Sequence, residues 1–208
     1  MTARPAIKGA AIATLVEDVR GLLEGQPADR ERLEAQLGRE TLLLLERKVN
    51  IASWYPIECY NELTGVLWRE QGASRPDYLR QRGERLIARL MEAGLYQQFT
   101  FMQRANETRR ERVPRADILH SARLIGSVTG AIRNFGRDEF EWDSEHSEHL
   151  LHHIHEARHL SEAMQLVGEG SLTYILHLLK PDAPPVRSRR LAPDHIVYRA
   201  DYSGVLAD

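Results

Sequence analysis

Apolar residues recur at helical spacing through the first half of the chain. The first stripe runs from Ile12 to Leu23 and stops at Gly25. Two shorter segments follow, over 29–37 and over 40–51, the second carrying the run Leu42–Leu45. Residues three or four positions apart share one face of a helix, and glycine commonly ends one. The pattern therefore predicts three helices in the first fifty residues.

Three more helices are predicted after Trp54-Tyr55-Pro56, which interrupts the periodicity. Ser53 and Pro56 suit the start of the first of these helices, since proline is tolerated in a first helical turn. The three helices are expected between Pro56 and Gly72, between Pro76 and Gly94, and after Pro114 as far as Ile132. The segment from Leu95 to Arg112 has no regular pattern.

The character of the sequence changes at Asn134-Phe135-Gly136, which is a turn signal. Phe140 and Trp142 alternate with acidic residues, and alternation also runs from Ile196 to Tyr202. Alternation is typical of half-buried strands, and Val186–Leu191 is expected to pair with the second of them. A helix is predicted over Ser171–Lys180, and Gly168-Glu169-Gly170 before it is interpreted as a turn.

These elements indicate an α+β fold in which an N-terminal helical part packs on a small C-terminal antiparallel sheet with one or two helices. The length of 208 residues suits a single domain over 1–208. Within it we expect a helical part over 1–115 and an α/β part over 116–208.

Composition excludes several classes of protein. The formal net charge of −2 gives no overall attraction for nucleic acid, so no nucleic-acid partner is expected. Cys59 is the only cysteine, which excludes a disulfide framework within one chain. The apolar runs are too short to span a bilayer, and no signal peptide is recognised at the start. We therefore expect a cytoplasmic protein that does not bind membranes.

Six of the nine histidines lie between positions 146 and 159. His155-Glu156-Ala157-Arg158-His159 matches the letters H-E-x-x-H, which on a helix would let His155 and His159 bind one zinc ion with Glu156 as a general base. On a strand the same two histidines would be roughly 13 Å apart, too far for one metal. Periodicity alone leaves helix and strand open over 148–160.

Several short motifs together carry a resemblance to a known family. They are Ile7-Lys8-Gly9, Ser53-Trp54-Tyr55-Pro56-Ile57, Gly83-Glu84-Arg85-Leu86, Ala122-Arg123-Leu124-Ile125-Gly126 and Gly168-Glu169-Gly170-Ser171-Leu172. Over about residues 7–202 the chain resembles a myxobacterial family of unknown function that is related to haem–nitric-oxide-binding and vinyl-4-reductase-like sensor domains. The resemblance implies a small ligand held between the helical part and the sheet, and it favours the strand over Leu150–Arg158.

The resemblance also raises haem as a cofactor. Haem-binding relatives use a histidine on a helix ahead of the sheet, a place that His120 could take, and a Tyr-x-Ser-x-Arg strand for the propionates. In this chain Ile154 and Glu156 replace the tyrosine and the serine, and only Arg158 matches. These departures argue against haem.

The leading hypothesis is a non-enzymatic module that senses a small apolar molecule or binds a protein partner. No cofactor is expected on this hypothesis, and a homodimer is compatible with it. The alternatives are a zinc-dependent hydrolase using His155, Glu156 and His159, and a haem-based gas sensor using His120. The expected ligand-binding residues are Trp54, Tyr55, Tyr60, Trp68, Leu86, Leu90, Ile125 and Arg158.

Overall fold

The computed structural model describes residues 4–25, 27–92 and 113–207. Its N-terminal part contains mostly helices. The elements in chain order are β1 (Ala6–Lys8), α1 (Gly9–Leu23), α2 (Pro27–Glu34), α3 (Arg39–Leu45), β2 (Trp54–Pro56), α4 (Ile57–Glu70) and α5 (Pro76–Glu92). Strands β1 and β2 pair antiparallel in a small sheet of their own.

The C-terminal part combines helices with a four-stranded sheet. Its elements are α7 (Arg115–Ile132), β3 (Arg137–Trp142), β4 (His149–His155), the 3-10 helix η1 (Ala157–His159), α8 (Glu162–His177), β5 (Arg187–Ala192) and β6 (His195–Asp201). The strand order is β3-β4-β6-β5, with every neighbouring pair antiparallel. The predicted α+β fold, with a helical first part and a C-terminal antiparallel sheet, is confirmed.

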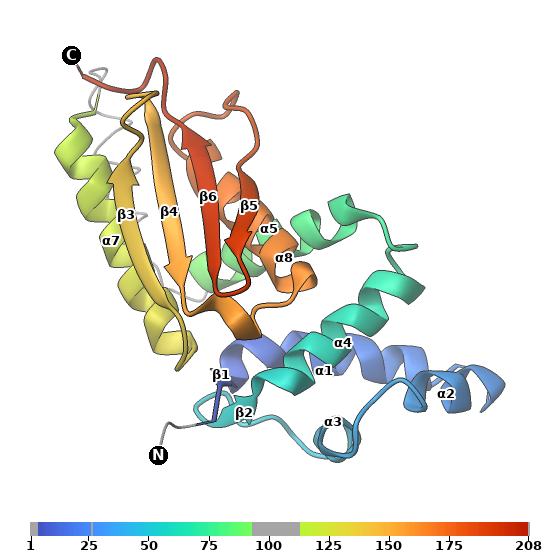
Figure 1. Cartoon of the computed structure of the whole chain (residues 1–208). Helices are drawn as coiled ribbons and strands as arrows, with labels where there is room; N and C mark the ends of the chain where they lie inside the picture. The colour runs from blue at the N-terminus through green and yellow to red at the C-terminus, as the bar shows by residue number, and fades with distance from the viewer. Residues whose placement is uncertain (1–3, 26, 93–112, 208) are drawn as a thin grey trace.

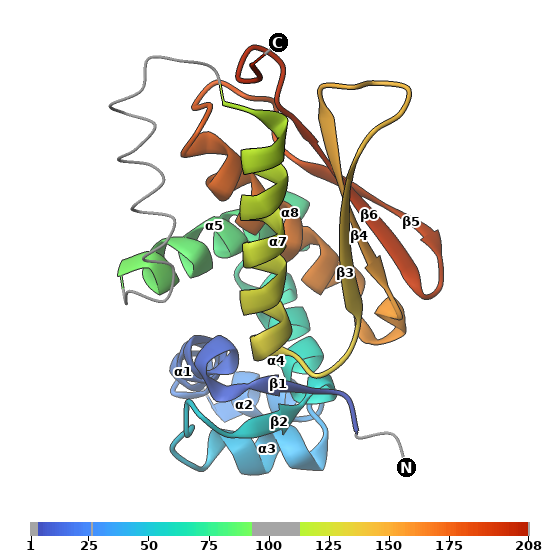
Figure 2. The same cartoon turned by 90° about the vertical axis from the view of Figure 1, so that its left-hand side faces the viewer.

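The helices cover one face of the four-stranded sheet. In Figure 1, α1 to α4 lie below the sheet, while α7, α5 and α8 lie behind it. Figure 2 shows the sheet from its side, with the labelled helices on one side of it and none against its other face. The sheet therefore has an inner face toward the helices and an outer face toward solvent.

The buried apolar residues follow the same division. One cluster joins α1, α3 and α4 through residues such as Val16, Leu63 and Leu67. A second joins α7, the inner face of the sheet and α8 through residues such as Ile118, Ile154 and Leu176. Strand β5 forms one edge of the sheet and carries Arg187, Arg189 and Arg190.

Helix α8 corrects the prediction for residues 162–180. The helix starts at Glu162, nine residues before the predicted start at Ser171, and ends at His177. The interpretation of Gly168-Glu169-Gly170 as a turn is wrong, because all three residues lie inside this helix. The two glycines instead allow close packing of α8: a Cβ on Gly170 would overlap the carbonyl of Arg80 on α5, and a Cβ on Gly168 would overlap the Tyr198 side chain on β6.

Two other predictions need smaller corrections, and one is untested. The helix expected over 40–51 ends at Leu45. The helix expected from Pro56 begins at Ile57, and the preceding residues pair with β1 as strand β2. The irregular segment predicted over 95–112 lies outside the described residues. Across the described ranges, no helix combines the length and apolar character that crossing a bilayer requires.

The histidine-rich segment is extended as far as His155, three residues short of the end of the strand that the resemblance favoured over Leu150–Arg158. Residues His149–His155 form strand β4, paired with β3 on one side and β6 on the other. Glu156 then takes a left-handed conformation, with φ 55° and ψ 30°, and the chain turns into η1. His155 and His159 consequently lie in different elements, and the helical H-E-x-x-H site is ruled out.

Candidate functional site

A cavity of about 160 Å³ lies between the helical part and the inner face of the sheet. Helices α1, α4, α5, α7 and α8 and strands β4 and β6 all contribute to its wall. Most of the lining side chains are apolar, among them Ile7, Tyr60, Leu86, Ile87, Ile125, Ile132, Ile154, Leu160, Met164, Val167, Leu172, Ile175 and Tyr198. The cavity therefore suits an apolar molecule.

An arginine and a histidine, Arg133 and His152, also line this apolar cavity. Arg133 follows α7, and its Nη2 donates to Oδ1 of Asp138 on β3 at 2.6 Å. His152 Nε2 lies 2.7 Å from the same Oδ1. The side chains are 6%, 10% and 12% exposed for Arg133, Asp138 and His152. The three residues form a buried polar triad beside the cavity.

Strand register holds the His152 ring in place. Phe140, His152 and Tyr198 are direct cross-strand neighbours on β3, β4 and β6. The His152 ring stacks on Phe140 at 4.2 Å between centroids and on Tyr198 at 5.6 Å. Because aromatic rings cover both of its faces, His152 can meet a further partner only at its edge.

Burial sets the charge states of the triad. Burial lowers the pKa of His152, and this effect outweighs the hydrogen bond to Asp138 that would raise it. Burial disfavours the Asp138 carboxylate, but the hydrogen bond from His152 and the charge of Arg133 hold the pKa of Asp138 below its usual range. The triad at neutral pH is thus a carboxylate, a guanidinium and a neutral imidazole.

Two polar atoms of the triad have no partner among the described residues. They are Arg133 Nε and His152 Nδ1, both fully buried. Neutral His152 donates from Nε2 to Asp138, so its Nδ1 is an acceptor. Arg133 Nε–H is a donor. A buried polar atom left without a partner is costly, so the pair is suited to a ligand that supplies a donor and an acceptor.

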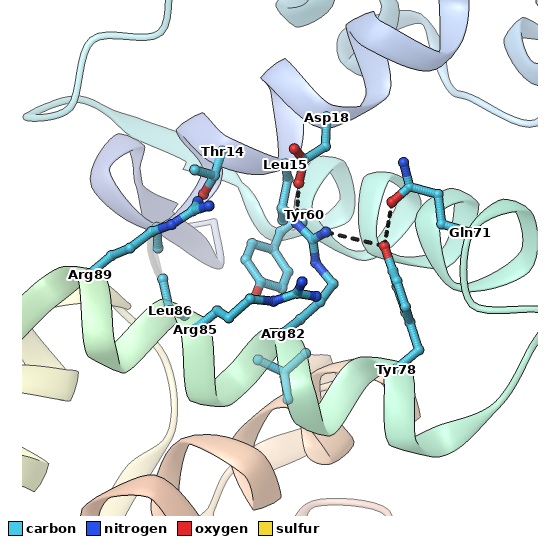
Figure 3. Close-up of a pocket in the computed structure, with 12 residues that line it drawn as sticks. Thr14, Leu15, Asp18, Tyr60, Gln71, Tyr78, Arg82, Arg85, Leu86 and Arg89 are labelled. Atoms are coloured by element: carbon cyan, nitrogen blue, oxygen red, sulfur yellow. Dashed lines mark hydrogen bonds and ion pairs between the residues drawn. The ribbon is translucent and has the colours of Figure 1, made fainter.

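A second, polar cavity of about 200 Å³ lies between α1, α4 and α5. Figure 3 shows Arg82, Arg85 and Arg89 projecting from α5 into it. Arg82 Nη2 donates to Asp18 Oδ2 at 2.6 Å. The polar cavity shares four lining residues with the apolar cavity: Ala11, Tyr60, Leu86 and Val167. The two spaces are therefore neighbours, separated by these side chains.

The eight residues expected to bind a ligand are not all in one place. Tyr60, Leu86 and Ile125 line the apolar cavity. The other five lie outside its wall: Trp54, Tyr55, Trp68, Leu90 and Arg158. Trp54 is 45% exposed on β2.

Sequence reasoning missed Arg133, Asp138 and His152. A usable signal existed for His152, because it alternates with Leu150 and Ile154 on the apolar face of one strand. The same alternation places Asp138 beside Phe140. No signal linked these strands to Arg133, because the contact depends on how α7 docks on β3.

The residues around the cavity do not fit haem. His120, the candidate axial ligand, is exposed on α7 and does not line the cavity, to which α7 itself contributes Ile125, Thr129 and Ile132. Arg158 is exposed as well. Pockets for drug-sized ligands measure about 300–1,000 Å³, so a cavity of about 160 Å³ has no room for a macrocycle of that size or larger.

Comparisons with known proteins bear on the fold. No family model matches the chain, and the curated proteins give no match. Among solved structures, an Fe(II) unliganded H-NOX protein from K. algicida has 12% identity and a TM-score of 0.53 over 97% of this chain and all of that one. A point variant of the same protein has a TM-score of 0.56 with 12% identity, covering 94% of this chain and 96% of the other.

A point variant of Tt H-NOX gives a TM-score of 0.55 at 10% identity, over 97% of this chain and 98% of that one. The matches cover nearly the whole of each chain, whereas the identities are far too low to carry residue roles across. The chain has an H-NOX-like fold.

Proposed function

We propose that this chain is a non-enzymatic sensor module that binds a small, largely apolar molecule in the cavity between its helices and its sheet. The observation that carries the proposal is an apolar cavity lined by Arg133 and His152, each of which has a buried polar atom with no partner in the part of the chain that the structure describes. The H-NOX-like fold supports a sensing role by analogy of fold. In this function, a protein partner reads the occupancy of the cavity.

The cavity wall limits the ligand in size and in chemistry. An apolar cavity of about 150 Å³ in another protein holds benzene, so a volume of about 160 Å³ suits a molecule of one ring. Arg133 Nε–H can donate to the ligand and His152 Nδ1 can accept from it. A hydroxyl group both accepts and donates. The expected ligand class is a small ring or short aliphatic chain that carries one hydroxyl.

Ligand binding would act on both parts of the molecule. The cavity wall comes from α1 and α4 on one side and from α7, α8 and the sheet on the other. A ligand that fits one arrangement of these elements better than another shifts the population toward it. Occupancy would thereby change how the helical part sits on the sheet.

The experiment is a thermal-shift titration with phenol and toluene as probes. Phenol should raise the melting temperature more than toluene, because only phenol satisfies the two buried atoms. Ile125→Phe fills the cavity and should abolish both shifts, while His152→Leu should reduce the phenol shift toward that of toluene.

Gly130→Ala is the matched control on the same helix, because no atom of the other described elements lies within 4 Å of a Cβ there. It should keep both shifts. The proposal fails if native mass spectrometry finds no small molecule co-purifying with the protein and neither probe shifts the melting of the native chain. Equal shifts in the native chain and in Ile125→Phe would place binding elsewhere.

A further inference from the structure

The outer face of the sheet gathers three histidines from two neighbouring strands. His153 and His155 are two residues apart on β4 and share this face, and His195 at the start of β6 is the cross-strand partner of His155. No labelled helix covers this side of the sheet in Figure 2. The cluster therefore combines fixed backbone positions with access to solvent.

The three imidazoles lie close enough to share one ion. Each offers one ring nitrogen, and the three nitrogens lie within 4.8 Å of one another. His153 Nδ1 is 3.0 Å from His195 Nε2. Two ligand atoms at about 2.0–2.1 Å from a tetrahedral zinc ion are about 3.3 Å apart. The His153–His195 separation is close to that spacing, and a small side-chain adjustment would bring the third nitrogen in.

A carboxylate completes the set from the third strand. Glu139 on β3 is opposite His153 in the register, and its Oε2 lies 3.1 Å from His155 Nε2. Its side chain is 49% exposed, so it is free to adjust. Glu141 Oε1 lies 3.3 Å from His153 Nε2, on the side of that ring away from His195, and adds a second carboxylate near the cluster.

We propose that His153, His155, His195 and Glu139 form a binding site for one divalent first-row transition-metal ion of the zinc class. Three imidazoles and one carboxylate are a ligand set that zinc accepts in tetrahedral geometry. The ion would link β3, β4 and β6 on the face opposite the apolar cavity. The site is independent of the proposed ligand-sensing function.

One positively charged side chain near the proposed site would repel a metal ion. Arg137 is the cross-strand partner of His155, and its Nη1 donates to Glu139 Oε2 at 3.3 Å. The Arg137 side chain is 62% exposed, so it can release the carboxylate and turn into water. Removing this arginine should therefore strengthen metal binding, whereas removing any of the four proposed ligands should weaken it.

The test is calorimetric titration of the full chain, without an affinity tag, with Zn²⁺ alone. We expect one ion per chain, and visible absorption bands of tetrahedral Co²⁺ when cobalt is used. His153→Ala and His195→Ala should each weaken binding by about tenfold or more. Glu139→Gln should also weaken it, and Arg137→Ala should tighten it, each about twofold to tenfold.

Two controls separate the cluster from the other histidines. His149→Ala changes the same face of β4 at its far end, and His159→Ala removes the second histidine of the H-E-x-x-H letters; both should bind zinc as the native chain does. Binding that survives His195→Ala unchanged would overturn the proposal, as would an equal loss in His149→Ala. Circular dichroism checks that each variant is folded. If a histidine variant unfolds, the zinc affinities of the Glu139→Gln and Arg137→Ala variants, whose substitutions are at exposed side chains, test the proposal instead.

Discussion

His152 and His153 are neighbours in the sequence but lie on opposite faces of strand β4. His152 is buried between Phe140 and Tyr198, and His153 belongs to the outer cluster with His155 and His195. Successive side chains of a strand point to opposite sides. A histidine-rich stretch that looks uniform in the sequence thus contains two kinds of histidine with different chemistry.

The buried histidine makes the stability of the fold depend on pH. The pKa of His152 is lowered in the folded chain, so below its unfolded pKa of about 6.5 the unfolded chain binds more protons. Lowering the pH from about 7.5 to about 5.5 should therefore reduce the free energy of unfolding, by up to about 1.4 kcal/mol per pH unit for this group. Urea unfolding at both pH values measures the change.

His152→Gln removes the titrating group, so the free energy of unfolding of this variant should change less between about pH 7.5 and about pH 5.5 than that of the native chain. His159→Gln, at an exposed position, should leave it as in the native chain. The lowered pKa of Asp138 adds a further loss of stability only at more acidic pH, because its carboxylate is protonated there. Identical pH profiles for the native chain and His152→Gln would contradict a neutral, buried His152.

At the scale of elements, the close contact between α5 and α8 holds the two parts of the molecule together. Gly83 on α5 faces the carbonyl of Val167, and Gly170 on α8 faces the carbonyl of Arg80. Glu169 between them accepts from Arg80 Nε at 2.7 Å and from the backbone nitrogen of Ser188 at 2.9 Å. One turn of α8 therefore binds both α5 and β5.

This contact predicts opposite effects for one substitution made at two helical glycines. Gly170→Ala should destabilise the fold by about 1–3 kcal/mol, because the added methyl overlaps the backbone of α5. Gly130→Ala on α7 meets no atom of another described element and should stabilise the fold by about 0.5–1 kcal/mol. Equilibrium unfolding in urea measures both, and a neutral Gly170→Ala would show that the helices are not in contact there.

Much of the element order follows from periodicity in the sequence. The 3.6-residue stripes predict α1, α4, α5 and α7, and the alternation predicts β3 and β6. Strand β5 was expected only as the segment that pairs with β6 across a turn. Strands β1 and β2 have three residues each, too few for alternation to be seen. The first half of α8 was missed because Gly168-Glu169-Gly170 has the composition of a turn. The residues that explain these three are distant in the chain: Tyr198 faces Gly168, and Arg80, 89 residues from Glu169, contacts Glu169 and Gly170.

At the scale of the whole molecule, an H-NOX-like fold surrounds a cavity that does not suit haem. The position of a ligand between helices and sheet was predicted from the family resemblance and not from the residues themselves. The wall of the cavity could not be predicted, because Tyr60, Ile125 and His152 are brought together by packing between distant segments. Local patterns instead favoured conspicuous aromatic residues such as Trp54, which is exposed.

The mismatch with haem leads to a direct expectation. Protein that is purified and then mixed with equimolar haem should develop no Soret band of a histidine-ligated haem, because no histidine of α7 lines the cavity and the volume is about 160 Å³. Absorption spectroscopy decides it, and His120→Ala should give the same spectrum as the native chain. A stoichiometric Soret band that disappears in His120→Ala would reverse this conclusion.

The arginines of β5 have a consequence for how copies of the protein meet. An edge strand offers unpaired backbone groups to any strand that approaches it, and charged side chains along the edge discourage such addition. A second copy aligned on this edge would bring Arg187 and Arg189 against identical guanidinium groups. At high concentration the molecules should therefore repel one another along this border, and a homodimer, if one forms, should use a different surface.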